Sequence, residues 1–430
     1  MSGCVIAAPS SGSGKTTITL GLLRALKNRG ISIASGKAGP DFIDPQFHAI
    51  ASGAKCYNFD PWAMRPELLI GQKNRLQSPD DFLLIEAMMG VFDGAADGTG
   101  SAGDLAALLN LPVILVVDCS KLSHSVAAVV SGFAHFRDDV HICGVILNKV
   151  ASTRHEKMLR GALSSQSIEI FGAIHRDDRF KLPERHLGLV QAGEHLKIEQ
   201  FIEDVASHIE QNLDMQRIID VADSKHSAQI PTVNALPPIA QNIAVASDMA
   251  FSFSYEHILT GWRDMGAELS FFSPLNDQTP SQNAKAIYLP GGYPELYAEK
   301  LSNCTSFRSA MRKAANEDKL IYGECGGYMV LGERLIDAHG VSHPMLGLLP
   351  LETSFASRKR QLGYRKLHPK NNLLWDGPLR GHEFHYSTVH KADHVEPLFS
   401  AGDAEDNALG DRGMRVGHVA GSYMHVVDRA

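Results

Sequence analysis

The stretch APSSGSGKTT, residues 8–17, decides the fold of the first half of this 430-residue chain. It follows an apolar run over 3–8 and opens a helical pattern over 15–29. A strand, a glycine-rich loop and a helix in this order predict a phosphate loop, whose backbone N–H groups turn onto phosphate oxygens. The strict motif is broken once, because Pro9 stands where a glycine is expected. A loop that merely caps a helix is the competing interpretation, and the context favours nucleotide binding.

Side chains of this loop are typical of a site for ATP and magnesium. Lys15 would neutralise charge on the outer phosphates, and the Thr16 hydroxyl would bind Mg²⁺. The predicted nucleotide-binding residues are Gly12, Ser13, Gly14, Lys15, Thr16 and Thr17.

Acidic residues follow two further predicted strands. Asp41 and Asp44 lie in GKAGPDFIDPQFH (36–48), and Glu86 and Asp93 in IEAMMGVFDG (85–94). Ligands of a parallel sheet sit at the carboxyl ends of its strands, so an acid there can hold Mg²⁺. Asp44-Pro45 and Asp93-Gly94 are also ordinary turn pairs, and for Asp93 alone the turn is favoured. Glu86 directly follows FLLI and needs a polar partner.

The remaining pattern predicts an α/β protein of two domains. Strands at 31–37, 82–86, 112–118 and 142–148 alternate with helical segments, which indicates a doubly wound parallel sheet. We expect this domain over 1–212, a polar, proline-containing linker over 213–240, and a second α/β domain over 241–430 that ends in antiparallel structure.

Composition excludes several classes of protein. The net charge is −7, and no basic patch supports nucleic-acid binding. The longest apolar run, 111–117, is too short to span a membrane. Six scattered cysteines without a C-x-x-C pair argue against a zinc ribbon or a disulfide framework. We therefore expect a cytoplasmic enzyme.

The second half contains a nucleophile elbow. Cys325 lies in YGECGGYM between a predicted strand and helix, and its small neighbours permit a strained turn. We expect an exposed sulfur with a lowered thiol pKa beside the helix N-terminus. Gly291 and Gly292, in YLPGGYPE, would supply the oxyanion hole. His425 is the predicted base, in competition with three other histidines, His382, His385 and His418.

The order of these motifs resembles the cobyrinic or hydrogenobyrinic acid a,c-diamide synthases over essentially the whole chain. The first half looks like a dethiobiotin-synthetase type of P-loop domain, and the second like a class I glutamine amidotransferase of the cobalamin pathway. The resemblance implies a ligase that makes ammonia from glutamine, activates the a and c carboxylates of a corrin-type ring as acyl phosphates with Mg·ATP, and amidates both. The oligomeric state is left undetermined by the resemblance, with a homodimer as one candidate.

The resemblance also implies residue roles. Thr16, Asp44 and Glu86 would lie at the metal, Asp41, Asp44 and Asp93 near the substrate, and Cys325 and His425 would be nucleophile and base. Many class I amidotransferases carry a glutamate where this chain has Val427, so either the pair of Cys325 and His425 suffices here or another acid, with Asp428 as the candidate, orients His425. The strings QLGYR (361–365) and GHEFHYS (381–387) match the same branch without an assigned role.

Alternative functions remain open at this point. Cobyric acid synthase and nickel-sirohydrochlorin a,c-diamide synthase share the design. A different class is a P-loop switch ATPase with an inactive amidotransferase-like module, but the intact elbow and the serines at Ser10 and Ser11, where such ATPases place a lysine, argue against it.

Overall fold

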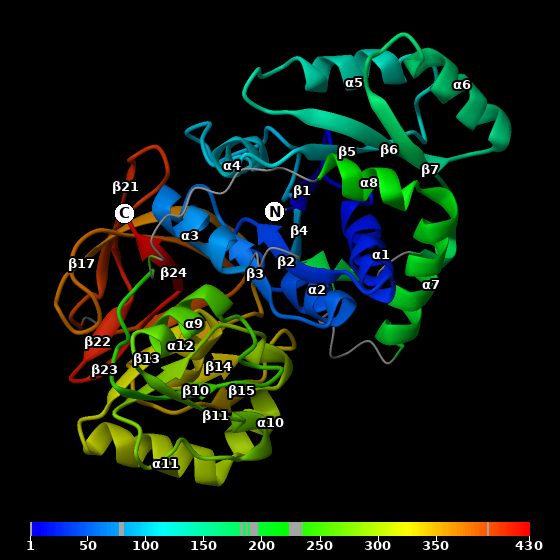
Figure 1. Cartoon of the computed structure of the whole chain (residues 1–430). Helices are drawn as coiled ribbons and strands as arrows, with labels where there is room; N and C mark the ends of the chain where they lie inside the picture. The colour runs from blue at the N-terminus through cyan, green and yellow to red at the C-terminus, as the bar shows by residue number, and fades with distance from the viewer. Residues whose placement is uncertain are drawn as a thin grey trace. The chain divides into compact units, whose positions relative to one another are not determined.

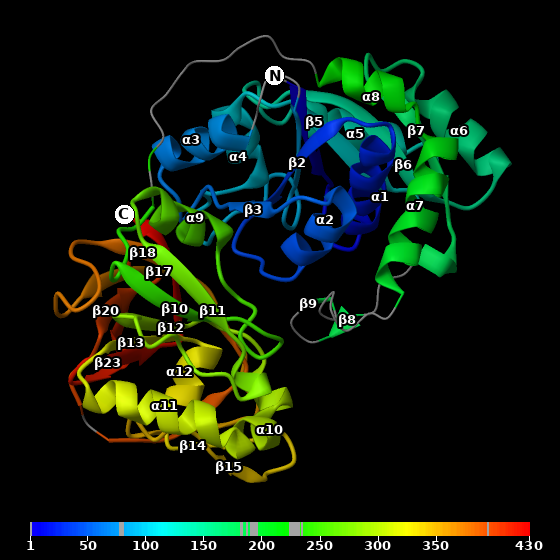
Figure 2. The same cartoon turned by 60° about the horizontal axis from the view of Figure 1, so that its bottom comes forward.

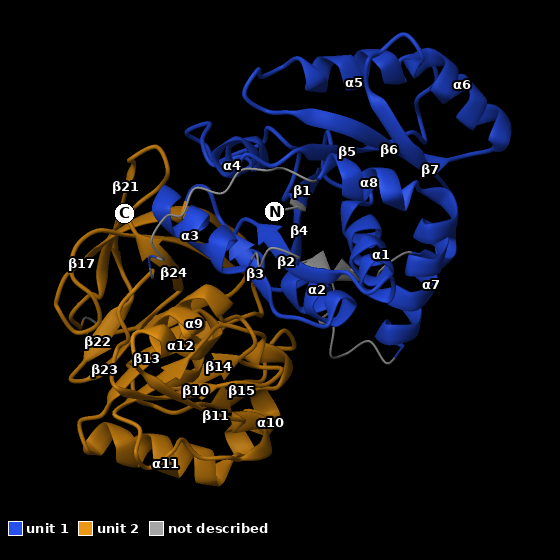
Figure 3. Cartoon of the chain, viewed as in Figure 1, with its two compact units in different colours: residues 1–62, 66–233 blue, residues 63–65, 234–430 orange. Residues whose placement is uncertain are grey.

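The computed structural model describes residues 2–76, 81–180, 184–185, 188–189, 197–222, 233, 235–393 and 395–430. The chain divides into two compact units, one of residues 1–62 and 66–233 and one of residues 63–65 and 234–430 (Figure 3). No helix among the described residues is long and apolar enough to cross a membrane.

Unit 1 is built on a seven-stranded sheet in the order β3-β2-β4-β1-β5-β6-β7, and every neighbouring pair is parallel. Its strands are β1 (Ser2–Ala7), β2 (Ser32–Ala38), β3 (Cys56–Phe59), β4 (Asp81–Glu86), β5 (Val113–Asp118), β6 (Ile142–Val150) and β7 (Glu169–His175). A further short antiparallel pair is β8 (Glu184–Arg185) with β9 (Gly188–Leu189). The apolar run of β5 is buried along its length, as expected for a strand covered on both faces.

Helices cover both faces of this sheet. They are α1 (Lys15–Asn28), α2 (Asp44–Ser52), α3 (Pro66–Leu76), α4 (Ala102–Leu109), α5 (Val126–Ala134), α6 (Thr153–Leu163), α7 (Ile198–Asn212) and α8 (Met215–Val221). From β1 to β3 the chain moves toward one edge of the sheet, and after β3 it moves toward the other edge, so right-handed crossovers place α1 and α2 on one face and α3 to α6 on the other. Figures 1 and 2 show α7 beside α1. The predicted doubly wound sheet is therefore confirmed.

The segment 213–240, predicted as a linker, begins with ordered structure. Its first part contains α8, in which Met215 and Ile218 are buried, and Gly3 donates a backbone hydrogen bond to Ala222. An amphipathic turn of helix was hidden in this stretch by its polar composition. Positions 223–232 and 234 of the expected linker lie outside the described residues.

Unit 2 joins a mainly parallel sheet, β11-β10-β12-β13-β23-β22, to an antiparallel sheet, β21-β20-β17-β18-β24. The strands up to the elbow are β10 (Asn242–Ala246), β11 (Glu268–Phe272), β12 (Ala286–Leu289) and β13 (Leu320–Glu324), and the helices are α9 (Glu256–Asp264), α10 (Ala298–Asn303), α11 (Thr305–Asn316) and α12 (Gly326–Leu331). Figure 1 shows α12 directly beside β13.

After α12, the described residues of unit 2 form strands and no further helix. A four-stranded sheet, β15-β14-β16-β19, completes it. The strands are β14 (Arg334–Ile336), β15 (Ser342–Pro344), β16 (Leu351–Ser354), β17 (Gln361–Pro369), β18 (Leu379–His385), β19 (Thr388–Ala392), β20 (Phe399–Gly402), β21 (Ala408–Arg412), β22 (Met414–Val416), β23 (Val419–Ser422) and β24 (Met424–Arg429). The expected antiparallel structure near the C-terminus is thus present.

Candidate active sites

The phosphate loop of unit 1 borders a cavity of about 910 Å³. Gly14, with φ of 88°, adopts a left-handed conformation that favours glycine, and a Cβ there would collide with the Asn148 amide. Asn148 and Lys149 hold the loop from β6, because their side chains donate to the carbonyls of Ser13 and Gly12. Phe180 also lines this cavity, and its carbonyl accepts a hydrogen bond from the Thr17 hydroxyl over 3.3 Å.

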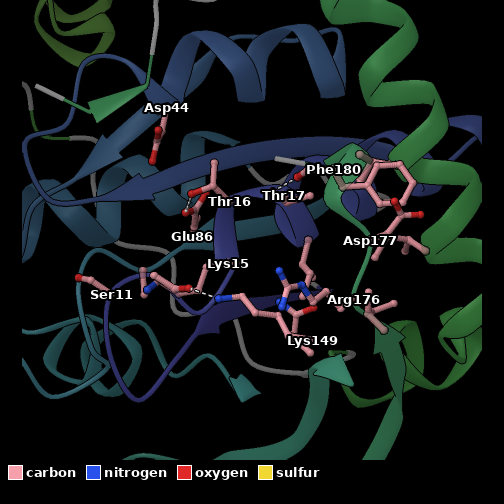
Figure 4. Close-up of a pocket in the computed structure, with 18 of the residues that line it drawn as sticks. Ser11, Lys15, Thr16, Thr17, Asp44, Glu86, Lys149, Arg176, Asp177 and Phe180 are labelled. Carbon is pink, nitrogen blue, oxygen red and sulfur yellow. Dashed lines mark hydrogen bonds between the residues drawn. The ribbon is translucent and has the colours of Figure 1, made fainter. Parts of the chain in front are cut away.

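Thr16 and Lys15 lie at the bottom of this cavity (Figure 4). The Thr16 hydroxyl donates to Glu86 Oε1 over 2.6 Å. Lys15 Nζ donates to the Met89 carbonyl over 2.7 Å, and burial lowers the pKa of its ammonium group. Lys15 Nζ also donates to the Ser10 carbonyl over 3.4 Å. A charged phosphate would provide better hydrogen-bond acceptors than these two carbonyls, so Lys15 can exchange partners when a nucleotide binds.

The acids expected near the metal meet at a buried lysine that sequence reasoning did not single out. Lys37 Nζ, on β2, lies 2.5 Å from Asp44 Oδ2 and 2.9 Å from Glu86 Oε1. Burial raises the pKa of Asp44 to about 6. Burial also opposes ionisation of Glu86, but Lys37, His48 and Thr16 together outweigh burial and lower the pKa of that carboxyl. The signal for Lys37 was a cation in the buried strand SIASGKA, which requires a counter-ion.

Behind Glu86 stands a second buried cation. His48 Nε2 lies 2.7 Å from Glu86 Oε2, and His48 Nδ1 lies 3.5 Å from the Cys56 sulfur. Burial disfavours the charged ring, but Cys56 and Glu86 together raise the pKa of His48 to about 10. Glu86 is therefore held on both oxygens by cations and by Thr16.

The two other predicted acids have structural partners. Asp41 accepts from the backbone N–H groups of Ile43 and Asp44 and also lines the cavity. Asp93 accepts from the backbone N–H of Gly90 and closes a turn over 90–93, which precedes its Asp-Gly pair. Asp93 is not among the described residues that line the cavity.

The Cys325 elbow lies between β13 and α12, as predicted. Cys325 has φ of 45°, a strained value for a residue with a side chain. A Cβ at Gly327 would lie 1.9 Å from the Leu289 carbonyl oxygen, so this turn requires glycine there. The expected exposed thiolate is wrong, however: Cys325 is only 3% exposed, and burial raises the pKa of its thiol. The α12 helix is too short to offset this desolvation.

His425 and Cys325 both lie against Gly291. A Cβ built on Gly291 would lie 2.5 Å from His425 Cε1 and 3.4 Å from Cys325 Cβ. Gly292 also approaches the elbow, since its backbone nitrogen would be 2.9 Å from a Cβ on Gly326. The structure therefore brings together the predicted nucleophile, base and glycine pair.

The competing histidines separate clearly. His382 pairs with His425 across β18 and β24, and their ring centroids are 4.8 Å apart. His385 Nε2 donates to Glu383 Oε1 over 3.0 Å, while His418 is half exposed near Asp318. Burial first, then His382 and His385, lower the pKa of His425, so its ring is neutral in the resting site.

Asp428 does not orient His425. Its two oxygens bind the Arg65 guanidinium over 2.9 and 3.0 Å. The carboxylate that faces His425 is Glu324, whose Oε2 lies 3.8 Å from His425 Nδ1. Sequence reasoning missed Glu324, although an acid ending the buried strand LIYGE was a visible signal.

The two unassigned motifs form one buried network. Arg365, from QLGYR, binds Glu383, from GHEFHYS, over 2.7 Å. The Phe384 carbonyl of the second motif lies 3.9 Å from the Cys325 sulfur. The second string therefore borders the Cys325 sulfur, and the first string is linked to the second through Arg365.

Comparison with known proteins agrees with both units. Residues 4–190 match the CobQ/CobB/MinD/ParA nucleotide-binding domain, and residues 242–429 match the CobB/CobQ-like glutamine amidotransferase domain. The hydrogenobyrinate a,c-diamide synthase of Rhizobium meliloti is 56% identical over 428 residues, covering 100% of this chain and 99% of that protein. Its counterpart in Mesorhizobium japonicum is 46% identical, over 99% of this chain and 98% of that protein.

Fold and sites together define a P-loop nucleotide-binding unit joined to a glutamine amidotransferase unit. Identity over the full length then places the chain more narrowly. It belongs to the hydrogenobyrinate a,c-diamide synthase family.

Proposed function

We propose that this chain amidates the a and c carboxylates of hydrogenobyrinate, using glutamine as nitrogen donor and ATP as activator, in cobalamin biosynthesis. The observation that carries the proposal is 56% identity across both units to proteins of that name. The intact elbow and the intact phosphate loop support it, because this reaction needs both. A switch ATPase with an inactive module would have no use for the Cys325 geometry.

Unit 1 performs the activation. A carboxylate is a poor acyl donor, and transfer of the γ-phosphoryl group to its oxygen creates a leaving group. Lys15 and Lys37 supply the positive charge that such a transfer needs. Asp41 and Asp93 are proposed to help place the macrocycle. The reaction belongs to a reducing cytoplasm, which suits six cysteines that form no disulfide.

The residues of unit 1 fit a magnesium ion. Thr16, Asp44 and Glu86 present only oxygen atoms, which Mg²⁺ prefers, and all three line the cavity. When bound, Mg²⁺ would neutralise phosphate charge. His48 fixes Glu86 from behind, so that Oε1 stays directed at Thr16.

Unit 2 supplies the ammonia. Cys325 gives its proton to His425, and the sulfur attacks the side-chain amide carbon of glutamine. His425 returns the proton to the leaving nitrogen as the C–N bond breaks. Water then hydrolyses the thioester to glutamate. Gly291 and Gly292 are proposed as oxyanion donors.

A mass-spectrometric amidation assay tests the function. Purified enzyme, Mg·ATP and glutamine are offered hydrogenobyrinic acid, cobyrinic acid or nickel-sirohydrochlorin in separate reactions. We expect two carboxyl-to-amide conversions on hydrogenobyrinic acid. Conversion of another ring alone would correct the substrate, and ATP hydrolysis without any amidation would refute the proposal.

A further inference from the structure

The acid that class I amidotransferases often place two residues after the histidine is missing here, since that position is Val427. A buried imidazole that must accept a proton still gains from a carboxylate on its other nitrogen. Asp428, the nearest acid in sequence, is already bound by Arg65. Unit 2 must therefore provide any such carboxylate from another element.

Glu324 is placed to do this from β13. It directly precedes Cys325, and its Oε2 lies 3.8 Å from His425 Nδ1. Only 3% of Glu324 is exposed. Because Nδ1 faces this carboxylate, Nε2 is left as the ring nitrogen that exchanges a proton with the thiol.

The Glu324 carboxylate is held by three donors. Tyr288 donates to Oε2 and Tyr322 to Oε1, each over 2.9 Å, and the Val426 backbone donates to Oε1 over 3.2 Å. Two of these donors come from strands β12 and β13, and the third is the residue next to His425. Such a network holds the Glu324 side chain in one position.

We propose that Glu324 is the positioning residue for His425 in glutamine hydrolysis, and that it replaces the acid absent at position 427. As Cys325 Sγ–H transfers its proton to His425 Nε2, the ring becomes a cation, and Nδ1–H closes the 3.8 Å separation to a hydrogen bond with Glu324 Oε2. The proton goes on to the leaving nitrogen of glutamine, and Glu324 takes up no proton. The inference rests on the proposed glutaminase reaction of unit 2.

The charges around His425 make this role specific. His382, on β18, packs against the ring, and His385 lies on the same strand, so neither offers negative charge. Glu383 is engaged by Arg365 and His385. Glu324 Oε2 lies within ion-pair distance of His425 Nδ1.

The protonation of Glu324 gives the role a pH signature. Burial raises the pKa of Glu324 to about 7, although both tyrosine hydroxyls favour its ionised form. Below pH 7 the carboxyl becomes neutral and no longer attracts the imidazolium. Glutamine hydrolysis should therefore fall on the acid side of about pH 7 in the wild type.

The test compares Glu324→Gln with Asp428→Asn, two isosteric carboxylate-to-amide changes next to the site. Glutamate release is measured with and without Mg·ATP and hydrogenobyrinic acid. We expect Glu324→Gln to lower kcat roughly 10²- to 10⁴-fold with little change in the KM for glutamine. Asp428→Asn should stay within about threefold, as expected for an acid that pairs with Arg65 and not with His425. Glu324→Asp should recover part of the lost kcat.

Two further readouts exclude a merely structural effect. Amidation with ammonium chloride bypasses glutamine hydrolysis and so measures the reaction of unit 1 alone. Glu324→Gln should leave the rate of this amidation within about twofold of the wild type. Failure of this amidation in the wild type would count against the proposed function and not against Glu324. A Glu324→Gln enzyme that keeps glutamine kcat within threefold, or keeps the acid limb near pH 7, overturns the role.

A wild-type measurement covers the case in which Glu324→Gln does not fold. The enzyme, labelled with ¹⁵N-histidine, is treated with 6-diazo-5-oxo-L-norleucine, which alkylates the nucleophilic thiol. The proposal expects a strongly deshielded Nδ1 proton from His425 that is lost as the pH falls below 7. Absence of this resonance at pH 8 would contradict a hydrogen bond to Glu324.

Discussion

The two sites hold their proton-active groups in opposite states. In unit 1, Lys37 and His48 are charged, and each is paired with a buried carboxylate. In unit 2, Cys325 and His425 are both neutral, because burial penalises the thiolate and the imidazolium alike. The difference follows from the chemistry. Phosphoryl transfer needs standing charges around a charged substrate, whereas amide hydrolysis has to create its nucleophile only when an uncharged amide arrives.

The sharpest way to separate the two sites is Cys325→Ser. A serine at this strained turn keeps the shape but loses the sulfur nucleophile, so glutamine-supported amidation should fall at least ~10³-fold. Amidation from ammonium chloride should remain near the wild-type rate, because unit 1 is untouched. Product mass after both reactions measures this. Retained glutamine use would show that the elbow is not the glutaminase site.

Lys15→Ala should produce the reverse pattern with a comparable loss. Removing the ammonium that neutralises phosphate charge should lower amidation from either nitrogen source by roughly 10³-fold. Glutamate release without the macrocycle should persist. Lys27→Ala, at the other end of α1, is the matched control and should leave both rates unchanged. Equal loss for the two lysines would indicate a folding defect.

Acid should weaken unit 2 before unit 1. Burial lowers the pKa of His257 to about 4 and that of His382 to about 3. The stability that unit 2 gains by keeping these rings neutral is therefore complete above pH 6.5 and is lost as the pH falls. His425, whose pKa burial also lowers, acts in the same direction, whereas Glu324, with a pKa of about 7, and Asp428, whose pKa burial raises, act in the opposite direction. His48 has a pKa of about 10, so its contribution is present below pH 6.5 and is lost only as the pH rises towards 10.

The expected change in melting temperature on acidification is small, but it should be larger in unit 2 than in unit 1. Between pH 7.5 and 5, unit 2 should lose roughly 4 °C or more in Tm, and unit 1 less. Thermal proteolysis followed by peptide mass spectrometry distinguishes the units, because peptides from α9 and α1 report them separately. His257→Gln should flatten the dependence of unit 2. An equal shift in both units would mean that the buried histidines do not govern acid stability.

Most of the fold could be predicted from periodicity, since buried strands such as VILVVD and elbows such as YGECGGYM are local signals. The predicted nucleotide loop, elbow and histidine also lie where the motifs placed them. Charge states could not be read in this way. The Cys325 thiol was expected to ionise because a helix follows it, but desolvation is a property of the three-dimensional packing and outweighs a helix of six residues.

The second feature that could not be predicted was the pairing of side chains that are distant in the sequence. Lys37, Glu86 and His48 belong to different elements, and no spacing rule connects them before the sheet order is known. Asp428 looked suitable because it is near His425 in the sequence. Alternation along β24 instead turns it to Arg65, while Glu324 approaches from a neighbouring element.

The burial of Cys325 also bears on its durability. Peroxide oxidises thiolates, and it must reach the sulfur to do so. A protonated sulfur in a residue that is 3% exposed meets neither condition while the site is empty. The resting enzyme should therefore survive an oxidative burst that inactivates cysteine enzymes with standing thiolates, and glutamine should sensitise it. Trapping of sulfenic acid at Cys325, with and without glutamine, tests this expectation. More sulfenic acid in the absence of glutamine than in its presence would contradict it.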